Sequence, residues 1–185
     1  VEAQQEMELK AQVTGQIIGK YFKGGGVVTE GQPLYTIDPR TYQANLLNAQ
    51  AGLANARAAL ADAALNAERY TKLYEQSAVS KQVLDNAVMI RDQAQAAVNA
   101  QEALLQNAQK DMNETTVTAP FSGRIDTTAL EVGNFVTAGQ TTLAKISDTN
   151  PVFIKFSVAE TEYLKLLNAN NSLDNLRAVL ADGST

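Results

Sequence analysis

Apolar residues recur at heptad spacing through one long stretch of the chain, residues 39–113. Residues three and four positions apart share one face of a helix, so each repeat forms an apolar stripe, and two stripes can bury each other. The first stripe comprises Leu46, Ala49, Leu53, Ala56, Leu60, Ala63, Ala67, Tyr70 and Tyr74. The second comprises Leu84, Ala87, Ala94, Val98, Leu105, Ala108 and Met112. The pattern predicts a hairpin of two antiparallel helices, about 39–76 and 80–113, joined by a short turn.

Both predicted helices carry start signals. Asp38 can accept hydrogen bonds from free backbone N–H groups, and Pro39 suits the first helical position. Ser80 is a good N-cap for the second helix, and its loss should cost about 1 kcal/mol. At about 1.5 Å per residue, the first helix would be about 54 Å long, far more than a small globular core requires.

Within the stripes, Gln101 is a polar interruption of the kind that typically fixes register. Gly52 should cost about 1 kcal/mol relative to alanine, which suggests a close contact. Truncating Leu60 to alanine should cost about 2–5 kcal/mol if this side chain is fully buried. The same change at Leu65, off the stripe, should cost much less.

Short β segments flank the hairpin and repeat each other. Residues 14–17 (TGQI) match residues 122–125 (SGRI), and residues 28–32 (VTEGQ) match residues 136–140 (VTAGQ). Because the glycines are equally spaced in both copies, we interpret 11–38 and 114–148 as two halves of one β domain, split by the hairpin at 39–113. Residues 1–10 would be a strand leading into it from another domain, and residues 149–185, with alternating apolar residues after Pro151, would begin an antiparallel β-barrel.

Composition excludes several kinds of chemistry. The 185 residues include no histidine and no cysteine, so histidine acid–base catalysis, thiol chemistry, disulfides and the usual Cys/His zinc sites are excluded. The net charge of −5 argues against a nucleic-acid partner. No apolar run has the length of a membrane span. We expect no enzyme activity, no cofactor and no metal, and a fragment without a targeting segment.

The two β halves resemble those of a lipoyl or biotinyl carrier domain. A carrier presents a modified lysine on the turn between its halves, whereas here the hairpin replaces that turn and no Asp-Lys or Met-Lys pair stands at the junction. A carrier-type domain with a coiled-coil insertion therefore remains an alternative that intact mass could decide. A free-standing coiled-coil scaffold without affinity for any channel is another.

Such a split domain followed by a β-barrel resembles the periplasmic adaptors, or membrane fusion proteins, of drug-efflux pumps of the resistance-nodulation-division (RND) type. Residues 35–42 (YTIDPRTY), 118–125 (TAPFSGRI) and 150–154 (NPVFI) carry the resemblance. It implies an α+β fold: a lipoyl-like β domain split by a long antiparallel coiled-coil hairpin, followed by the start of an antiparallel β-barrel.

The family's hairpin-tip motif is an arginine, a leucine four residues on and a serine seven residues after that, and Arg69, Leu73 and Ser80 have this spacing. The resemblance implies that they dock on a TolC-like outer-membrane channel. Each also has a structural interpretation: Arg69 as a solvated charge, Leu73 as packing and Ser80 as a helix cap.

The implied function is a non-catalytic adaptor between that channel and an inner-membrane transporter of RND type. The hairpin's moderate length points to the drug-efflux branch. An adaptor of an ATP-driven exporter is the alternative of the same class. The resemblance also implies hexameric self-association in the pump and a periplasmic location, with an inner-membrane anchor formed by an N-terminal segment or lipid absent from this chain. Exposed Ala54, Ala61, Ala97 and Leu104 would supply apolar area for neighbouring copies.

Overall fold

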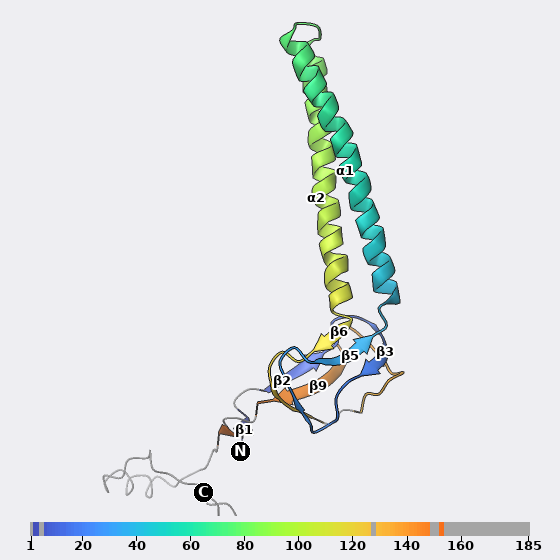
Figure 1. Cartoon of the computed structure of the whole chain (residues 1–185), viewed down its shortest axis with the longest axis vertical. Helices are drawn as coiled ribbons and strands as arrows, with labels where there is room; N and C mark the ends of the chain where they lie inside the picture. Colours follow the sequence, from blue (N-terminus) through green and yellow to red (C-terminus); the bar gives the residue numbers. More distant parts are fainter. Residues whose placement is uncertain (1, 4–5, 127–128, 149–151, 154–185) are drawn as a thin grey trace, which may run out of the picture.

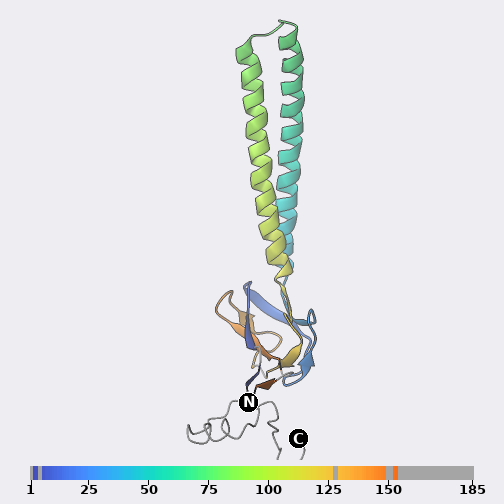
Figure 2. The same ribbon diagram turned by 90° about the vertical axis from the view of Figure 1, so that its left-hand side faces the viewer.

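A computed structural model describes residues 2–3, 6–126, 129–148 and 152–153 of the chain. A long helical hairpin projects from a small β domain, and the tip of the hairpin lies at the far end from that domain (Figure 1). The hairpin consists of α1 (Arg40–Glu75) and α2 (Lys81–Asn113). When the molecule is turned by 90°, the two helices lie side by side toward the tip, and α2 passes in front of α1 near the β domain (Figure 2). The predicted antiparallel hairpin is confirmed.

The predicted start of the first helix is confirmed in part, because α1 begins at Arg40 and Pro39 occupies the N-cap position. The backbone of Pro39 already has helical angles, φ −86° and ψ −6°, one residue before α1 begins. The Asp38 carboxylate accepts a hydrogen bond from the N–H of Arg40 at 3.1 Å and a fork from the Arg40 guanidinium, with its shortest contact at 2.6 Å. These bonds from Arg40 lower the pKa of Asp38, so the carboxylate stays charged at the helix N-terminus.

The two predicted stripes form the interface between the helices. The buried residues of both helices all belong to the stripes: Leu53, Ala63 and Ala67 in α1, and Ala87 and Val98 in α2. Leu60 is half-buried, so its truncation should cost less than full burial implied. Tyr74 is 41% exposed because α1 ends one residue later.

Gly52 and Gln101 face each other across this interface. A Cβ atom built on Gly52 would lie 2.7 Å from Oε1 of Gln101, closer than the two atoms can approach. The close contact expected at Gly52 is therefore confirmed, and its partner is the polar residue that interrupts the second stripe. A large side chain that packs opposite a glycine fits at only one relative position of the two helices, and so helps to fix their register.

Gly52→Ala alone should change the free energy of unfolding little. Alanine gains about 1 kcal/mol of helix propensity, but the new methyl group displaces the Gln101 side chain. In a Gln101→Ala background the same substitution should stabilise the hairpin by about 1 kcal/mol. Chemical denaturation of the four proteins of this double-mutant cycle measures the difference. Equal effects in both backgrounds would show that the contact carries no energy.

The β domain is a sandwich of two four-stranded sheets that are built from both halves of the repeat. One sheet has the order β2 (Glu6–Lys10), β9 (Thr142–Ser147), β7 (Gly123–Ile125) and β4 (Val27–Val28). The other has the order β6 (Thr116–Thr118), β5 (Pro33–Ile37), β3 (Gly15–Lys20) and β8 (Phe135–Val136). Each sheet therefore contains strands from before and after the hairpin, so neither half forms a sheet of its own. A separate antiparallel pair joins β1 (Glu2–Ala3) to β10 (Val152–Phe153).

The core of the β domain lies between the sheets and is almost entirely aliphatic. Its largest fully buried side chains are Tyr35, Ile17, Leu34, Ile37, Ile125, Leu143, Ile146, Val28 and Val136. The Tyr35 ring meets Phe22 edge to face at 5.1 Å, and its hydroxyl donates to the Leu143 carbonyl at 3.3 Å. Because both halves contribute to this core, the hairpin is held at its base by a domain that only the whole split repeat can form.

The internal repeat is visible as matching hydrogen bonds. The N–H of Gly31 donates to the Ala119 carbonyl at 2.8 Å, and that of Gly139 donates to the Ala11 carbonyl at 2.7 Å. Both glycines have left-handed backbones, with φ of 77° and 72°. Residues with a Cβ atom rarely adopt this conformation, so the turn in each half needs its glycine. The two halves thus bind each other through the same turn.

Residues 6–10 and residues 149–185 flank the β domain as the sequence analysis defined it. Residues 6–10, which the sequence analysis separated from the β domain, form β2 and pair along β9 from Glu6↔Ser147 to Lys10↔Thr142. In the structure this strand is therefore part of the β domain, where it covers one edge of β9, and Glu6 also pairs with Lys145. Of the predicted partial barrel at 149–185, the structure describes β10 alone, and the rest lies outside the described residues.

Candidate docking site at the hairpin tip

The turn at the hairpin tip is closed by its own backbone. The N–H groups of Ser77 and Ala78 donate to the carbonyls of Tyr74 at 2.8 Å and Leu73 at 2.9 Å, which satisfies two carbonyls at the end of α1. Ser77 takes the left-handed conformation, with φ of 58°. Residues 76–80 therefore form a defined turn that presents the neighbouring side chains.

Arg69 extends from α1 about two turns below this end and is exposed to solvent. Its guanidinium donates to the Asn66 amide oxygen at 3.2 Å. Within residues 6–126 and 129–148, no carboxylate lies at ion-pair distance from Arg69. Its charge is thus uncompensated, and most of its planar set of donors is open to another molecule.

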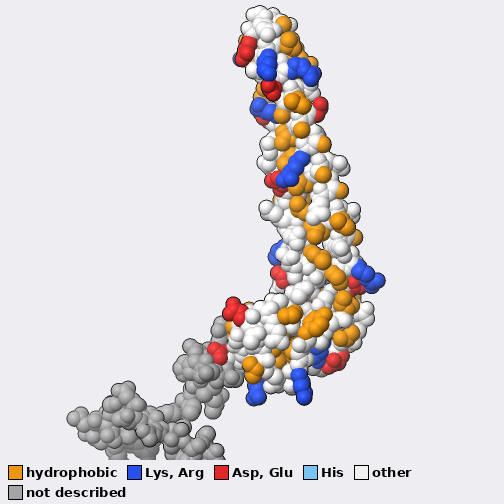
Figure 3. Space-filling view, in the orientation of Figure 1, with side chains coloured by type: hydrophobic (Ala, Val, Ile, Leu, Met, Phe, Trp, Pro, Cys, Tyr) orange, Lys and Arg blue, Asp and Glu red, His pale blue; other side chains and the backbone are white. Residues whose placement is uncertain are grey.

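The neighbouring cation Lys72 has a different environment. It forms an ion pair with Glu68 at 2.7 Å, one helical turn away. This contact lowers the pKa of Glu68 and raises the pKa of Lys72, so both stay charged and neutralise each other. Charged side chains of both signs gather toward the tip in the space-filling view, above a shaft with many apolar atoms (Figure 3). Among the described residues at the tip, Arg69 and Lys81 therefore carry positive charges without a carboxylate partner, whereas Lys72 does not.

Leu73 lies one turn after Arg69 on the same face of α1 and is half-buried. Ser80 is exposed on the other side of the turn, immediately before α2. The structure thus brings all three predicted residues to the same end of the hairpin. We call Arg69, Leu73 and Ser80, which supply one guanidinium, one partly exposed leucine and one hydroxyl, the tip triad.

The expected cap at Ser80 is only partly present. Ser80 occupies the N-cap position of α2 with an extended backbone, and its carbonyl accepts from the N–H groups of Val83 at 3.1 Å and Leu84 at 3.3 Å. Its hydroxyl, however, makes no capping hydrogen bond. The expected side-chain cap is therefore wrong: the backbone alone starts the helix, and the hydroxyl remains available.

Ser80→Ala should accordingly leave the hairpin nearly as stable as before. With no capping bond to lose, the change should cost less than about 0.5 kcal/mol, as at an ordinary surface position, rather than about 1 kcal/mol. Thermal or chemical denaturation of the purified chain measures this. A loss near 1 kcal/mol would mean that the hydroxyl caps α2 in solution.

Sequence reasoning missed an apolar groove just below the tip. The groove has a volume of about 470 Å³ and is lined on the α1 side by Ala63 and Tyr70 and on the α2 side by Val83 and Ile90. Val83 and Ile90 are 41% and 47% exposed. Their separation by one heptad, off the predicted stripe, is the signal that could have indicated it.

Two further observations limit what the described residues can do. They contain no group of three or more acidic, histidine or cysteine side chains that could hold a metal ion. None of the helices in the described part is both long and apolar enough to cross a membrane.

Comparison with known proteins decides the family. The family model "RND MFP, barrel-sandwich hybrid domain", where MFP denotes membrane fusion protein, matches residues 5–147. The chain belongs to the RND membrane fusion protein family. The matched range starts just before β2 and ends with β9, so it comprises both β halves and the hairpin between them.

Curated relatives agree with this assignment. The multidrug export protein AcrE of Escherichia coli is 36% identical over 187 residues, covering 96% of this chain and 49% of the relative. The toluene efflux pump periplasmic linker protein TtgA of Pseudomonas putida is 38% identical, over 96% of this chain and 45% of the relative. The membrane fusion protein MtrC of Neisseria gonorrhoeae is 40% identical, over 90% and 40%. The chain thus spans about half the length, or somewhat less, of the relatives it matches.

Solved structures share the fold. A MacA–MexA chimera that contains the α-hairpin domain of Pseudomonas aeruginosa MexA matches with a TM-score of 0.52 and 34% identity, covering 80% of this chain and 49% of the chimera. A putative efflux transporter from Bacteroides eggerthii matches with a TM-score of 0.53 and 30% identity, covering 92% and 48%. ZneB from Cupriavidus metallidurans, at 23% identity and a TM-score of 0.57, supports the fold alone.

Proposed function

We propose that the chain is part of a non-catalytic periplasmic adaptor that links an inner-membrane RND efflux transporter to a TolC-like outer-membrane channel, and that the tip triad docks on the channel. One observation carries this proposal. Arg69, Leu73 and Ser80 lie together, accessible, at the end of a long hairpin whose other end is held by the β domain.

The chemistry of the tip triad suits docking on another protein. A guanidinium without a carboxylate partner can bind backbone carbonyls or carboxylates through several N–H groups at once. A half-buried leucine held at a fixed turn offers an apolar contact without prior rearrangement. The Ser80 hydroxyl, free of a capping role, can donate or accept. Each group has unused binding capacity that a partner could fill.

Self-association is the second part of the proposal. Ala54, Ala61 and Ala97 are exposed on the shaft, and Leu65 and Leu104 are 62% and 54% exposed there. Apolar side chains on the outside of a slender hairpin are available to neighbouring hairpins, and closed rings are the usual way to satisfy identical surfaces. We propose a hexameric ring with the hairpins side by side. Chemical cross-linking of full-length protein in membranes should reach a hexamer, and a ladder that stops at the dimer would contradict it.

Cross-linking from single introduced cysteines tests the docking itself. The chain has no cysteine of its own, so Ala78→Cys in the tip turn and Ala61→Cys on the shaft each carry one reactive site. Both positions are exposed. With a photoreactive maleimide in cells that make the matching channel, Ala78→Cys should form a product with the channel, whereas Ala61→Cys should not. Equal products from both sites, or none from Ala78→Cys, would overturn the proposed docking.

A further inference from the structure

The base of the hairpin is joined to the β domain in a way that needs a brace. α1 continues from β5 and α2 leads into β6, and these two strands are neighbours in one sheet. Backbone hydrogen bonds hold the two connections together, for instance from Ile37 N–H to the Thr115 carbonyl at 2.8 Å. The hairpin could still tilt relative to the β domain about a line through these two connections. A third contact away from that line is needed to fix its direction.

Tyr42, in the first turn of α1, makes such a contact. Its hydroxyl donates to the carbonyl of Thr14 at 2.7 Å and accepts from the N–H of the same residue at 3.1 Å. Thr14 immediately precedes β3, which lies on the opposite side of β5 from β6. The Tyr42 contact therefore attaches the helix itself, through a side chain, one strand beyond the two chain connections at β5 and β6.

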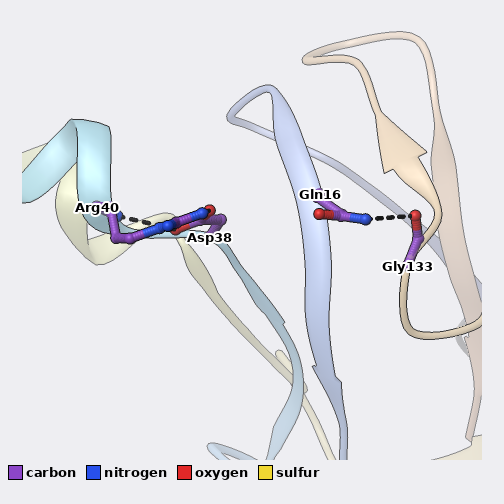
Figure 4. A network of polar contacts seen from close by, with 4 residues as sticks. All are labelled: Gln16, Asp38, Arg40 and Gly133. Atoms are coloured by element: carbon purple, nitrogen blue, oxygen red, sulfur yellow. Dashed lines mark hydrogen bonds and ion pairs between the residues drawn. The ribbon is translucent and has the colours of Figure 1, made fainter.

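The Thr14 segment is itself held firmly. Its hydroxyl accepts from the N–H of Ala138 in the second half at 3.0 Å, and two residues on, the Gln16 amide donates to the Gly133 carbonyl at 2.9 Å. Figure 4 shows the latter contact together with the Asp38–Arg40 pair at the start of α1. The brace thus reaches from the helix to both halves of the β domain.

Comparison of the two halves of the repeat shows which hydrogen bonds around Thr14 belong to the β domain itself and which are made by Tyr42. In the second half, the Ser122 hydroxyl accepts from Glu30 N–H at 2.9 Å, just as Thr14 accepts from Ala138. The bonds from Tyr42 to the Thr14 backbone are additional to this shared pattern. The Tyr42 ring also packs against the core of the β domain, beside a hollow of about 690 Å³ that is lined by Tyr42, Asp38 and Phe135 among others.

We propose that Tyr42 is a positioning residue: through the Thr14 backbone it sets the direction of the hairpin relative to the β domain, and so the place where the tip lies. That a fixed hairpin direction helps docking on a channel rests on the proposed function. That Tyr42 fixes this direction does not. Distances measured on the purified full chain without any channel therefore test this inference separately.

Spin labels at Lys23→Cys in the β domain and Ala61→Cys on the hairpin, both exposed, report the direction by pulsed electron spin resonance. Tyr42→Phe, which removes only the hydroxyl, should broaden the distance distribution between the labels. It should also speed hydrogen exchange at the Thr14 amide about 2- to 10-fold, the range expected for one lost hydrogen bond. Para-aminophenylalanine at position 42, which restores a donor on the same ring, should narrow the distribution again.

A matched variant acts as the control. Tyr74→Phe makes the same chemical change near the tip, away from the Thr14 backbone. It should keep the parent distribution. An unchanged distribution in Tyr42→Phe would overturn the proposal. So would loss of helix content or of the β-domain melting transition, because Tyr42 would then serve folding rather than direction.

Discussion

Leu73→Asp and Arg69→Glu should each reduce drug resistance to the level of cells that lack the adaptor, when introduced into the full-length protein alongside the matching channel. Aspartate places a charge where a docking partner would bury an apolar side chain, which costs several kcal/mol if it stays unpaired. Glutamate at position 69 reverses a tip charge that has no carboxylate partner among the described residues, so attraction to carbonyls or carboxylates becomes repulsion. Drug susceptibility at equal protein levels measures both effects.

The folded hairpin should survive both substitutions. Arg69 is exposed, so its replacement should change the free energy of unfolding by less than about 0.5 kcal/mol. Leu73 is half-buried, so aspartate should cost about 1 kcal/mol there, which a hairpin anchored in an intact β domain can tolerate. Circular dichroism and thermal denaturation check this before resistance is compared.

Matched changes elsewhere on the hairpin separate docking from general damage. Leu47→Asp makes the same change at a leucine that is 58% exposed near the β domain. Arg91→Glu reverses a charge on the shaft that already lies beside Asp92. Both should keep resistance near the parent level. Parent-level resistance in Leu73→Asp and Arg69→Glu would refute the docking role of the tip triad and leave the family assignment untouched.

The hairpin was predictable because its signal is local and repeated. Heptad spacing states which residues of each helix face the partner, and buried Leu53, Ala63 and Val98 all lie on the predicted stripes. The split repeat was predictable for a similar reason, since the glycine turns need the same residues in each half. Sequence therefore specifies these features within a few residues of where they occur.

What sequence did not predict depends on contacts between distant residues. The pairing of β2 with β9 joins the two ends of the β domain, and no local pattern says which strand will cover which edge. The bonds from Tyr42 to Thr14 depend on how α1 leaves the sheet. At the tip, the sequence placed Arg69, Leu73 and Ser80 by spacing alone, but the missing cap at Ser80 follows from the geometry of the turn.

The stability of the hairpin should depend most on the stripe positions that the structure buries, and Leu53 is the strongest test. It is 5% exposed, so Leu53→Ala should cost about 2–4 kcal/mol, from lost burial and from the cavity left between α1 and α2. Leu60→Ala should cost less, because Leu60 is half-buried, and Leu65→Ala, at a residue that is 62% exposed, should cost under about 0.5 kcal/mol.

Chemical denaturation of the three variants, followed by the helical signal in circular dichroism, measures this order. The three substitutions remove the same atoms from leucines on one helix, so helix propensity and unfolded-state effects are nearly equal and burial remains as the difference. The helical signal reports the hairpin, since α1 and α2 contain all the α-helix of the described residues. Equal losses at Leu53 and Leu65 would mean that the hairpin in solution does not have this register. A loss at Leu65 that appears only at high protein concentration would instead indicate that this face is covered by a second copy, as the proposed ring requires.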